Sequence, residues 1–406
     1  MDSPIVIAGG GAAGRAAAQT LLAAGAQPLL HLAGPDGEVL DRTLVDKAIM
    51  TGRITPERAQ SMRPPLDGLE TRTDSLVTVD PPSPAEAAPG AADPLRLTLG
   101  SGEEIDAAAL LVATGSSPRT VDVPGHAPWA RAGRLTTLHS VADAMTVRTL
   151  LADRTGARVL VSGAGLVGSE AATLLSEAGH TVTLVAPSTP PGEAALGRTL
   201  ASRLAQIHAE AVDTRFGARL VRLEELPGSA PGVAVLSDGS RIEADLVIIA
   251  HGARPHVPQG VGGEAGIPVD DRLRVRGRPD ILAAGAVALF TAGDRRTAHD
   301  TDGRTAYRID HWDDAEAQGV HAARTLLHDR GLREDPGAYR PLAPWSARIH
   351  GRQLAGFGHR LPGAQERIVS EDPLLVEFVD EAGDACAVLG LDAGRMLRDH
   401  GRSLRG

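Results

Sequence analysis

The stretch that decides the fold is "PIVIAGGGAAGRAAAQTLLAAGAQPLLHLAG", residues 4–34. A short apolar run leads into three spaced glycines, and an alanine-rich segment and a second apolar run follow. The order strand, glycine turn, helix and strand over about 30 residues is typical of a βαβ unit that binds a dinucleotide. Gly9, Gly11 and Gly14 fit the spacing G-x-G-x-x-G directly after the first strand.

A second stretch, "ARVLVSGAGLVGSEAATLLSEAGHTVTLVAP" (157–187), has the same order, and Gly163, Gly165 and Gly168 repeat the spacing. In such a turn the first glycine permits a sharp bend, the second lets the backbone approach a pyrophosphate, and the third packs helix against strand. The helix N-terminus then presents its N–H groups and partial positive charge to the phosphates. One motif alone also fits an ordinary tight turn, but two copies in the same context predict two nucleotide-binding units.

Each unit is followed by a meander and a buried strand that ends in a glycine. The first closing strand ends in "ATG" (Ala113, Thr114, Gly115) and the second in "AHG", with Gly252. From about residue 330 the pattern changes: 373–393 predicts a hairpin and 394–404 a final helix. We therefore predict an α/β fold of two Rossmann-like dinucleotide-binding domains plus a small C-terminal α+β domain.

Composition excludes several classes of function. The formal net charge of −10 disfavours a nucleic-acid partner, which needs a basic surface. The single cysteine, Cys386, excludes an intrachain disulfide and a Cys-x-x-Cys redox pair. No apolar run approaches the ~18 residues of a membrane helix, and the start "MDSPIVIAGG" has no secretory pattern, so we expect no membrane contact and a cytoplasmic location. The histidines show no metal-binding spacing beside acids, so we expect no metal site.

The acid that usually follows the second strand of a dinucleotide unit and bonds the ribose is missing from both copies. Pro35 stands near that place in the first copy, with Asp36 one residue further on. Ala186 and Pro187 stand at the tip in the second copy, and no arginine is there to bind a 2′-phosphate. The choice between NADH and NADPH is therefore not readable from these positions.

Several stretches together resemble flavoproteins of the pyridine nucleotide–disulfide reductase superfamily, in particular its NADH-dependent ferredoxin, rubredoxin and putidaredoxin reductases. Residues 36–52 are similar to the family pattern Y-D-R-P-P-L-S-K, with Asp41, Arg42 and Lys47 at the same spacing. "RIDHWDDAEAQG" (308–319) matches R-I-E-x-W-x-N-A-x-x-Q-G, which no general Rossmann rule predicts. The absence of a cysteine pair also fits this branch, whose flavin passes electrons singly to an iron–sulfur protein.

The resemblance implies FAD and NAD(P)H as cofactors and a small iron–sulfur protein of ferredoxin type as partner. It implies that Lys47 lies beside the flavin ring and pairs with Glu170, and these two are the expected catalytic residues. It also implies that Arg42 faces the flavin pyrophosphate and that Trp312 flanks the flavin or the nicotinamide site. The residues expected to contact a cofactor are Gly9, Gly11, Gly14, Arg42, Lys47, Ala113, Thr114, Gly115, Gly163, Gly165, Gly168, Glu170, Gly252, Gly285 and Trp312.

The same resemblance suggests a division of the chain. We expect an FAD-binding domain from 1–122 and 247–328, an NAD(P)-binding domain from 123–246, and a C-terminal α+β interface domain from 329–406. The oligomeric state is not readable from the sequence.

Four positions depart from the family pattern. The turn that usually reads "GD", whose aspartate bonds the ribityl chain, reads Gly285–Ala286 here, and His139 replaces an arginine. Losing a hydrogen bond to a charged acceptor costs about 1.5–3 kcal/mol, and the ribose positions Pro35 and Ala186 add to the loss.

Three interpretations stay open at this point. The first is an FAD-dependent ferredoxin-reductase-like enzyme that passes hydride from nicotinamide to flavin and then electrons to an iron–sulfur protein. The second is a repurposed homologue in a biosynthetic pathway, with flavin binding weakened or lost and a different redox activity or none. The third is a non-catalytic nucleotide-binding or scaffold protein, since a fold does not fix a function.

Overall fold

The first glycine turn lies in a six-stranded sheet of the computed structural model, which describes residues 3–34, 37, 40–80, 94–225, 232–291, 306–380 and 382–405. The strands are β1 (Ile5–Ala8), β2 (Leu29–Leu32), β3 (Glu70–Arg72), β7 (Ala109–Val112), β19 (Arg274–Val275) and β20 (Arg278–Ala283). They lie in the order β19-β20-β7-β1-β2-β3, and all neighbours are parallel except β19 and β20. The first unit is thus built from two segments that are far apart in the sequence.

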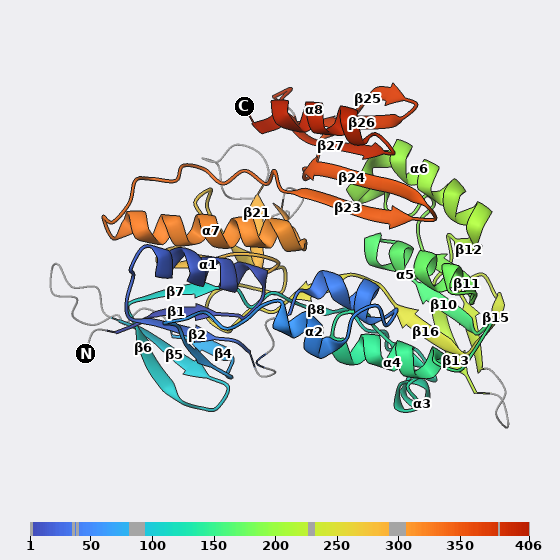
Figure 1. Ribbon diagram of the computed structural model, residues 1–406, viewed down its shortest axis with the longest axis horizontal. Helices are drawn as coiled ribbons and strands as arrows, with labels where there is room; N and C mark the ends of the chain where they lie inside the picture. The colour runs from blue at the N-terminus through green and yellow to red at the C-terminus, as the bar shows by residue number, and fades with distance from the viewer. Residues whose placement is uncertain are drawn as a thin grey trace.

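Helices α1 (Ala12–Ala23) and α7 (Trp312–Asp329) lie side by side on one face of this sheet (Figure 1). Their backbones approach closely, because a Cβ at Gly319 of α7 would lie 2.1 Å from the carbonyl oxygen of Ala13 in α1. The other face carries an antiparallel sheet of β4 (Leu76–Val79), β5 (Leu95–Leu99) and β6 (Glu104–Ala107). The alternation of apolar and polar residues on either side of 81–93 is typical of the first two of these strands. The loop between them, 81–93, lies outside the described residues.

The second glycine turn lies in a five-stranded parallel sheet with the order β12-β11-β10-β16-β9. Its strands are β9 (Leu135–Thr136), β10 (Arg158–Ser162), β11 (Thr181–Ala186), β12 (Asp213–Phe216) and β16 (Leu246–Ile249). Its helices are α4 (Val141–Leu151), α5 (Leu166–Glu177) and α6 (Glu193–Ala211). The meander consists of β13 (Leu220–Glu224), β14 (Gly232–Leu236) and β15 (Arg241–Ala244). The predicted strand, turn, helix and strand are therefore present in both units.

The C-terminal part is an antiparallel five-stranded sheet with the order β23-β24-β27-β26-β25, covered by helix α8 (Gly394–Arg405). Its strands are β23 (Pro344–Ile349), β24 (Arg352–Gly358), β25 (Gln365–Glu371), β26 (Leu374–Val379) and β27 (Ala385–Leu391). The predicted hairpin is β26 and β27, and the predicted final helix is α8. The fold class expected from the sequence is confirmed.

Short elements connect these layers. They are η1 (Arg42–Leu44), the π-helical turn η2 (Val45–Ile49), α2 (Pro56–Ser61), β8 (Ser116–Pro118), α3 (His126–Arg131), β17 (Ala253–Pro255), β18 (Ile267–Pro268), β21 (Ala288–Thr291) and β22 (Ala306–Tyr307). Strands β8 and β17 follow the two closing strands and pair antiparallel with each other.

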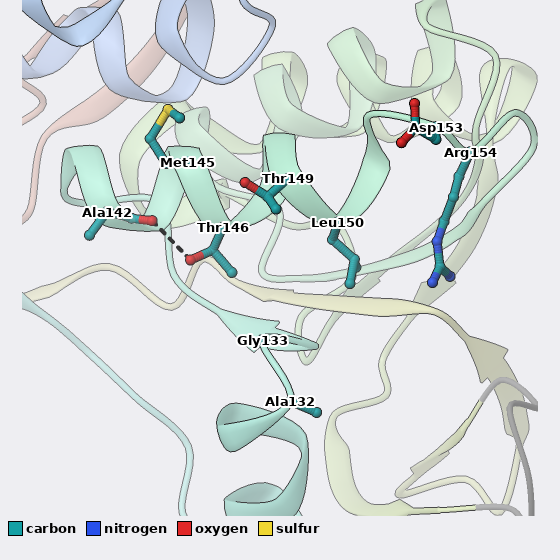
Figure 2. Close-up of a pocket in the computed structure, with 9 residues that line it drawn as sticks. All are labelled: Ala132, Gly133, Ala142, Met145, Thr146, Thr149, Leu150, Asp153 and Arg154. Atoms are coloured by element: carbon teal, nitrogen blue, oxygen red, sulfur yellow. Dashed lines mark hydrogen bonds between the residues drawn. The ribbon is translucent and has the colours of Figure 1, made fainter.

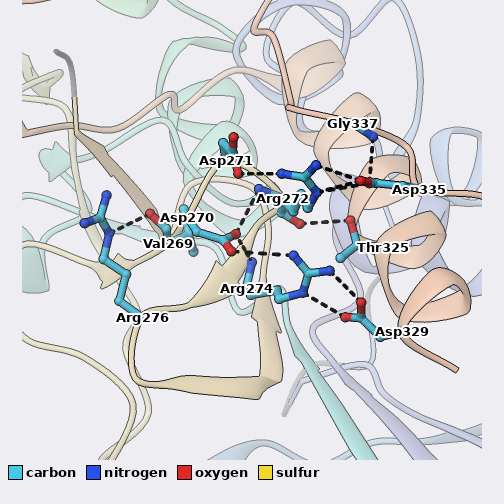
Figure 3. Close-up of polar contacts among 10 residues, drawn as sticks. All are labelled: Val269, Asp270, Asp271, Arg272, Arg274, Arg276, Thr325, Asp329, Asp335 and Gly337. Carbon is cyan, nitrogen blue, oxygen red and sulfur yellow. Dashed lines mark hydrogen bonds and ion pairs between the residues drawn. The ribbon is translucent and has the colours of Figure 1, made fainter. Parts of the chain in front are cut away.

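Arg272, just before β19, and Arg274, the first residue of β19, hold the end of α7 in place (Figure 3). Arg272 donates to both carboxylate oxygens of Asp335, and Arg274 donates to both oxygens of Asp329, the last residue of α7. Thr325 donates its hydroxyl hydrogen to the Arg272 carbonyl at 2.9 Å. These contacts fix the chain where it leaves α7 toward the C-terminal sheet.

The core is built mainly of small aliphatic side chains, as the 2% aromatic content predicts. In the largest buried cluster, around β1, β7 and β20, Phe290 is the only buried aromatic residue among those described. Trp129 is completely buried in the core of the second unit. Alanine and glycine at the contacts let strands and helices approach closely, which positions the two glycine turns accurately.

Candidate functional site

In the first glycine turn, Gly9 and Gly14 pack against the backbone, whereas Gly11 faces open space. Gly9 has φ +127°, and a Cβ there would lie 2.0 Å from the Ala113 carbonyl oxygen; a Cβ at Gly14 would lie 1.8 Å from the Gly9 carbonyl oxygen. At Gly11 a Cβ would meet nothing within 4 Å. Gly11 is also the N-cap of α1, and no side chain caps the helix there. The turn therefore leaves an open cradle lined by backbone N–H groups, which fits a pyrophosphate.

The second turn repeats this arrangement residue for residue. A Cβ at Gly163 (φ +114°) would lie 2.2 Å from the Ala250 carbonyl oxygen, and one at Gly168 would lie 1.9 Å from the Gly163 carbonyl oxygen. Gly165 faces open space and begins α5 without a side-chain cap. The residues present thus fit a dinucleotide at both turns.

The turns that end the closing strands also leave room. Gly115 (φ +70°) and Gly252 (φ +75°) have nothing within 4 Å of a Cβ position. Thr114 donates its hydroxyl hydrogen to the His256 carbonyl at 2.5 Å, and the Gly252 carbonyl accepts from the backbone N–H of Arg119. The two turns are thereby tied to each other across β8 and β17.

A hollow of about 640 Å³ lies beside the first cradle, within the size range of ligand sites. Arg15 of α1 and His31 of β2 line it. His31 is 3% exposed and its Nε2 donates to the Gly9 carbonyl at 3.0 Å, so this ring supports the turn itself. Pro35 and Asp36, where the ribose acid was sought, lie outside the described residues. In the second unit Ala186 ends β11 and is buried.

Lys47 and Glu170 meet directly. Lys47 lies on the π-helical turn η2, Glu170 lies in the first turns of α5, and Lys47 Nζ is 2.9 Å from Glu170 Oε2. The Glu170 side chain is 10% exposed and that of Lys47 is 39% exposed. Burial lowers the pKa of Lys47, but the neighbouring carboxylates outweigh it and the pKa is raised, so the ammonium is charged at neutral pH.

A third member of this cluster, Asp46, was not among the residues predicted from the sequence. Its carboxylate oxygens lie 3.1 and 3.2 Å from Lys47 Nζ, and the residue is 5% exposed. A readable signal pointed to this place: Lys47 is the only lysine in the chain, among 41 lysine and arginine residues. An ammonium is a compact charge with three rotatable donors, so Lys47 can donate to Asp46 and Glu170 at once.

Arg42 lies among Asp310, Asp143 and His139. Burial lowers its pKa, while the charges of Asp310 and Asp143 raise it. Burial and then the charge of Arg42 lower the pKa of His139 to about 4, so this residue is neutral at pH 7. His139 Nε2 is buried and has no hydrogen-bond partner among the described residues. Neutral His139 therefore adds no second positive charge next to Arg42. Its buried Nε2 atom is available to a ligand.

Trp312 begins α7 and is covered on one side by an arginine. The Arg63 guanidinium lies 4.6 Å from the ring centroid, and Trp312 Nε1 donates to Glu316 at 3.1 Å. Asp313 and Asp314 lie in the first turn of α7, where the helix dipole favours acidic side chains, and the N-cap is His311.

Gly285 and Ala286 form the turn that departs from the family pattern. A Cβ at Gly285 would lie 3.1 Å from Ala13 Cβ, so the turn adjoins the start of α1. The carbonyl of Ala286 accepts from Arg308 at 2.5 Å. The turn keeps its place beside the first cradle although the side-chain carboxylate is missing.

Another hollow, of about 680 Å³, lies elsewhere (Figure 2). It is an open groove along α4 and contains none of the predicted site residues. Its lining residues are Ala132, Gly133, Ala142, Met145, Thr146, Thr149, Leu150, Asp153 and Arg154. No helix of the described residues is long and apolar enough to cross a membrane.

Two open dinucleotide cradles in adjoining parallel sheets, with a lysine–carboxylate cluster beside the second, define a two-dinucleotide oxidoreductase fold. Comparison with known proteins agrees: the profile described as pyridine nucleotide-disulphide oxidoreductase matches residues 3–319, and the chain belongs to this family. With Cys386 as its single cysteine, the chain has no disulfide pair of its own.

Individual relatives cover different parts of the chain. It is 36% identical over 199 residues to a nitric oxide reductase FlRd-NAD(+) reductase of Aeromonas hydrophila, covering 48% of this chain and 49% of that protein. It is 29% identical to putidaredoxin reductase CamA of Pseudomonas putida, covering 70% and 67%. The chain spans about half the length of the first curated relatives it matches. The crystal structure of Fdr9 superposes with a TM-score of 0.79 at 26% identity, covering 100% of this chain and 95% of Fdr9.

Proposed function

We propose that this chain is an FAD-dependent NAD(P)H oxidoreductase of ferredoxin-reductase type that delivers electrons to a small iron–sulfur protein. The observation that carries the proposal is the 2.9 Å contact between Lys47 and Glu170, because it joins the segment after the first cradle to the helix that opens the second. The relatives named as reductases of putidaredoxin and of a dioxygenase ferredoxin support the same reading.

Each part of the chain has a definite task in this proposal. When bound, FAD supplies a ring that accepts hydride from NAD(P)H and returns the electrons singly. The cradles at Gly11 and Gly165 hold the two pyrophosphates through backbone N–H groups. The Lys47 ammonium offsets negative charge at the ring, and Glu170 holds the ammonium in place.

The alternative interpretation, a repurposed homologue with weakened or lost flavin binding, is based on Ala286 and His139, among other departures from the family pattern. The comparisons support the reductase instead, and the open cradles fit bound nucleotides. For the division of the chain we propose 1–122 with 247–328 for FAD, 123–246 for NAD(P)H and 329–406 as the interface domain. We also propose the cytoplasm as the compartment, on the ground that the chain has one cysteine.

The test is reconstitution with FAD followed by anaerobic reduction with NADH and, separately, with NADPH. We expect the absorbance spectrum of bound flavin, and we expect its visible bands to bleach on addition of either NADH or NADPH. Lys47→Met should retain FAD but slow the bleaching at least tenfold, since the ring loses its counter-charge. Arg53→Met, which removes an exposed cation of the same segment, is the matched control. A chain that stays colourless with added FAD contradicts the proposal.

A further inference from the structure

Three charged side chains share one small volume at the Lys47 site. The Lys47 ammonium contacts Glu170 Oε2 at 2.9 Å and both oxygens of Asp46 at 3.1 and 3.2 Å. With one cation between two buried carboxylates, the fully ionised cluster carries a net charge of −1. A buried net charge is costly, and two carboxylates that share a site tend to retain one proton between them.

Among the residues that the structure describes, the elements packed around the cluster form no second ion pair with it. Helix α5 contributes Glu170, whose other oxygen, Oε1, accepts the backbone N–H of Arg348 at 3.3 Å. At the start of α7, His311 faces Lys47, and burial lowers the pKa of His311. Within the described residues, Lys47 is the only cation that forms an ion pair with either carboxylate.

The charged groups on the remaining neighbours point to other partners. On α4, Asp143 accepts from the backbone N–H groups of His139 and Ser140, and Arg148 lies against Met145. In η1, Arg42 faces Asp310 and Asp143. The excess negative charge therefore stays on the cluster itself.

Of the two carboxylates, Asp46 is the one placed to hold the proton. Burial raises the pKa of Asp46 to about 6, with Lys47 lowering it and Glu170 raising it. Asp46 also lies on the π-helical turn η2, a rare backbone form that often occurs at functional sites. Its partner Lys47 has a side chain that is 39% exposed, so the cluster is in contact with solvent through the lysine.

We propose that Asp46 is the proton-holding residue of this site, which takes up one proton from solvent when the bound flavin is reduced and releases it when the flavin is reoxidised. The inference rests on the proposed function. Asp46 acts through Lys47 and is a positioning residue, since nothing places it in contact with the ring itself.

The charges balance in this step. Hydride carries two electrons and one proton, so its acceptor gains one negative charge while the nicotinamide loses its hydride. The Asp46 carboxylate takes one proton from solvent, so the site as a whole keeps its charge. On reoxidation, two electrons would pass one at a time to the iron–sulfur partner. The proton that arrived with the hydride and the proton held by Asp46 would then both return to solvent, so the charges balance again.

The first experiment needs no cofactor chemistry. Because Lys47 is the only lysine, labelling with carbon-13 lysine gives one side-chain signal whose pH titration reports its carboxylate neighbours. We expect a step near pH 6 in the wild type, no such step in Asp46→Asn, and an unchanged step in Glu377→Gln. Glu377 is the matched control because it is a buried carboxylate, 7% exposed, in the C-terminal sheet.

The second experiment measures the midpoint potential of bound FAD against pH. Above about pH 6 the wild type should take up one more proton per two electrons than Asp46→Asn, and the variant potential should be less negative. Asp46→Ser serves as a second variant if Asp46→Asn does not fold. Proton uptake by the wild type on reduction in weakly buffered solution gives the same stoichiometry without any substitution.

The outcomes separate the two proposals. A chain that binds FAD but shows equal proton uptake in wild type and Asp46→Asn overturns the role of Asp46 alone. A lysine titration without a step near pH 6 also overturns it. A chain that takes up no FAD overturns the proposed function, and the role of Asp46 with it.

Discussion

The backbone N–H of Gly285 donates to the side-chain oxygen of Gln318 at 2.7 Å, inside a region closed to solvent. The Gln318 amide nitrogen donates in turn to Asp314 at 2.7 Å, and the Tyr339 hydroxyl donates to the same carboxylate at 3.0 Å. A chain of buried hydrogen bonds thus runs from the turn beside the first cradle to the segment that leads into the C-terminal sheet. It holds the turn in place without the aspartate that the family pattern has next to it.

Replacing Gln318 by leucine should destabilise the protein by about 1–3 kcal/mol, because the buried Gly285 N–H loses its acceptor and Asp314 loses a donor. Urea unfolding measures the loss. FAD affinity should fall together with stability, since the turn adjoins Ala13 at the first cradle. Gln365→Leu, on the exposed edge strand β25, is the matched control and should change neither quantity.

Arg274→Met should cost about 1–2 kcal/mol, because the end of α7 loses a two-fold hydrogen bond to Asp329 from a side chain that is only 18% exposed (Figure 3). Thermal unfolding measures this change. Arg72→Met breaks two exposed ion pairs, to Glu70 and Glu103, whose side chains are 60% and 53% exposed, and should shift stability by less than about 0.5 kcal/mol. Equal effects of the two substitutions would show that the Arg274 pair does not fix the helix end.

The two glycine turns and the fold could be predicted because they follow from local constraints. Only glycine fits at Gly9 and Gly14, because a Cβ there would lie about 2 Å from a backbone oxygen. Such positions are therefore recognisable in the sequence as a spaced glycine motif. Strand β6 and strands β23, β24 and β25 of the C-terminal sheet were not predicted. Strands β6 and β25 are mostly exposed, so their sequences lack the alternation of buried and exposed residues that marks a strand.

The site was predictable only in part, for a different reason. The pairing of Lys47 with Glu170 came from family resemblance, since 123 residues of chain separate them and no local pattern joins them. Asp46 shares the Lys47 ammonium with Glu170, and Gln318 accepts from Gly285; only the fold brings Glu170 and Gly285 to these places. A match to a sequence pattern places Gln318 in the family motif but does not show which group it binds.

Stability should fall as the pH falls below about 6.5, with His208 as one cause. His208 is 1% exposed and bonds Ser169 Oγ and His350 Nε2, both at 3.0 Å. Burial and then the neighbouring His350 lower the pKa of His208 to about 3. Between pH 3 and about 6.5 this histidine is protonated in the unfolded chain but neutral in the native protein. The free energy of unfolding therefore decreases as the pH falls, by up to about 1.4 kcal/mol per pH unit.

His208→Gln tests this origin of the pH dependence. The variant should be less stable at pH 7, because Ser169 and His350 lose a partner, but its stability should fall less steeply toward low pH, by about one proton. His126→Gln, with a side chain 37% exposed, should leave the slope unchanged. A slope that stays the same in His208→Gln would place the proton-linked loss on other groups.

The sharpest test of the cradles compares two glycines three residues apart. Gly11 has ordinary extended backbone angles and open space at its Cβ position, so Gly11→Ala should change the free energy of unfolding by less than about 0.5 kcal/mol. Its methyl group points where a pyrophosphate would approach, and FAD affinity should fall at least tenfold. Gly14→Ala should instead destabilise the protein itself, since its Cβ would lie 1.8 Å from the Gly9 oxygen. Unfolding without cofactor and FAD titration by fluorescence quenching separate the two effects. If Gly11→Ala binds FAD as tightly as the wild type, the open space at this turn is not the pyrophosphate site.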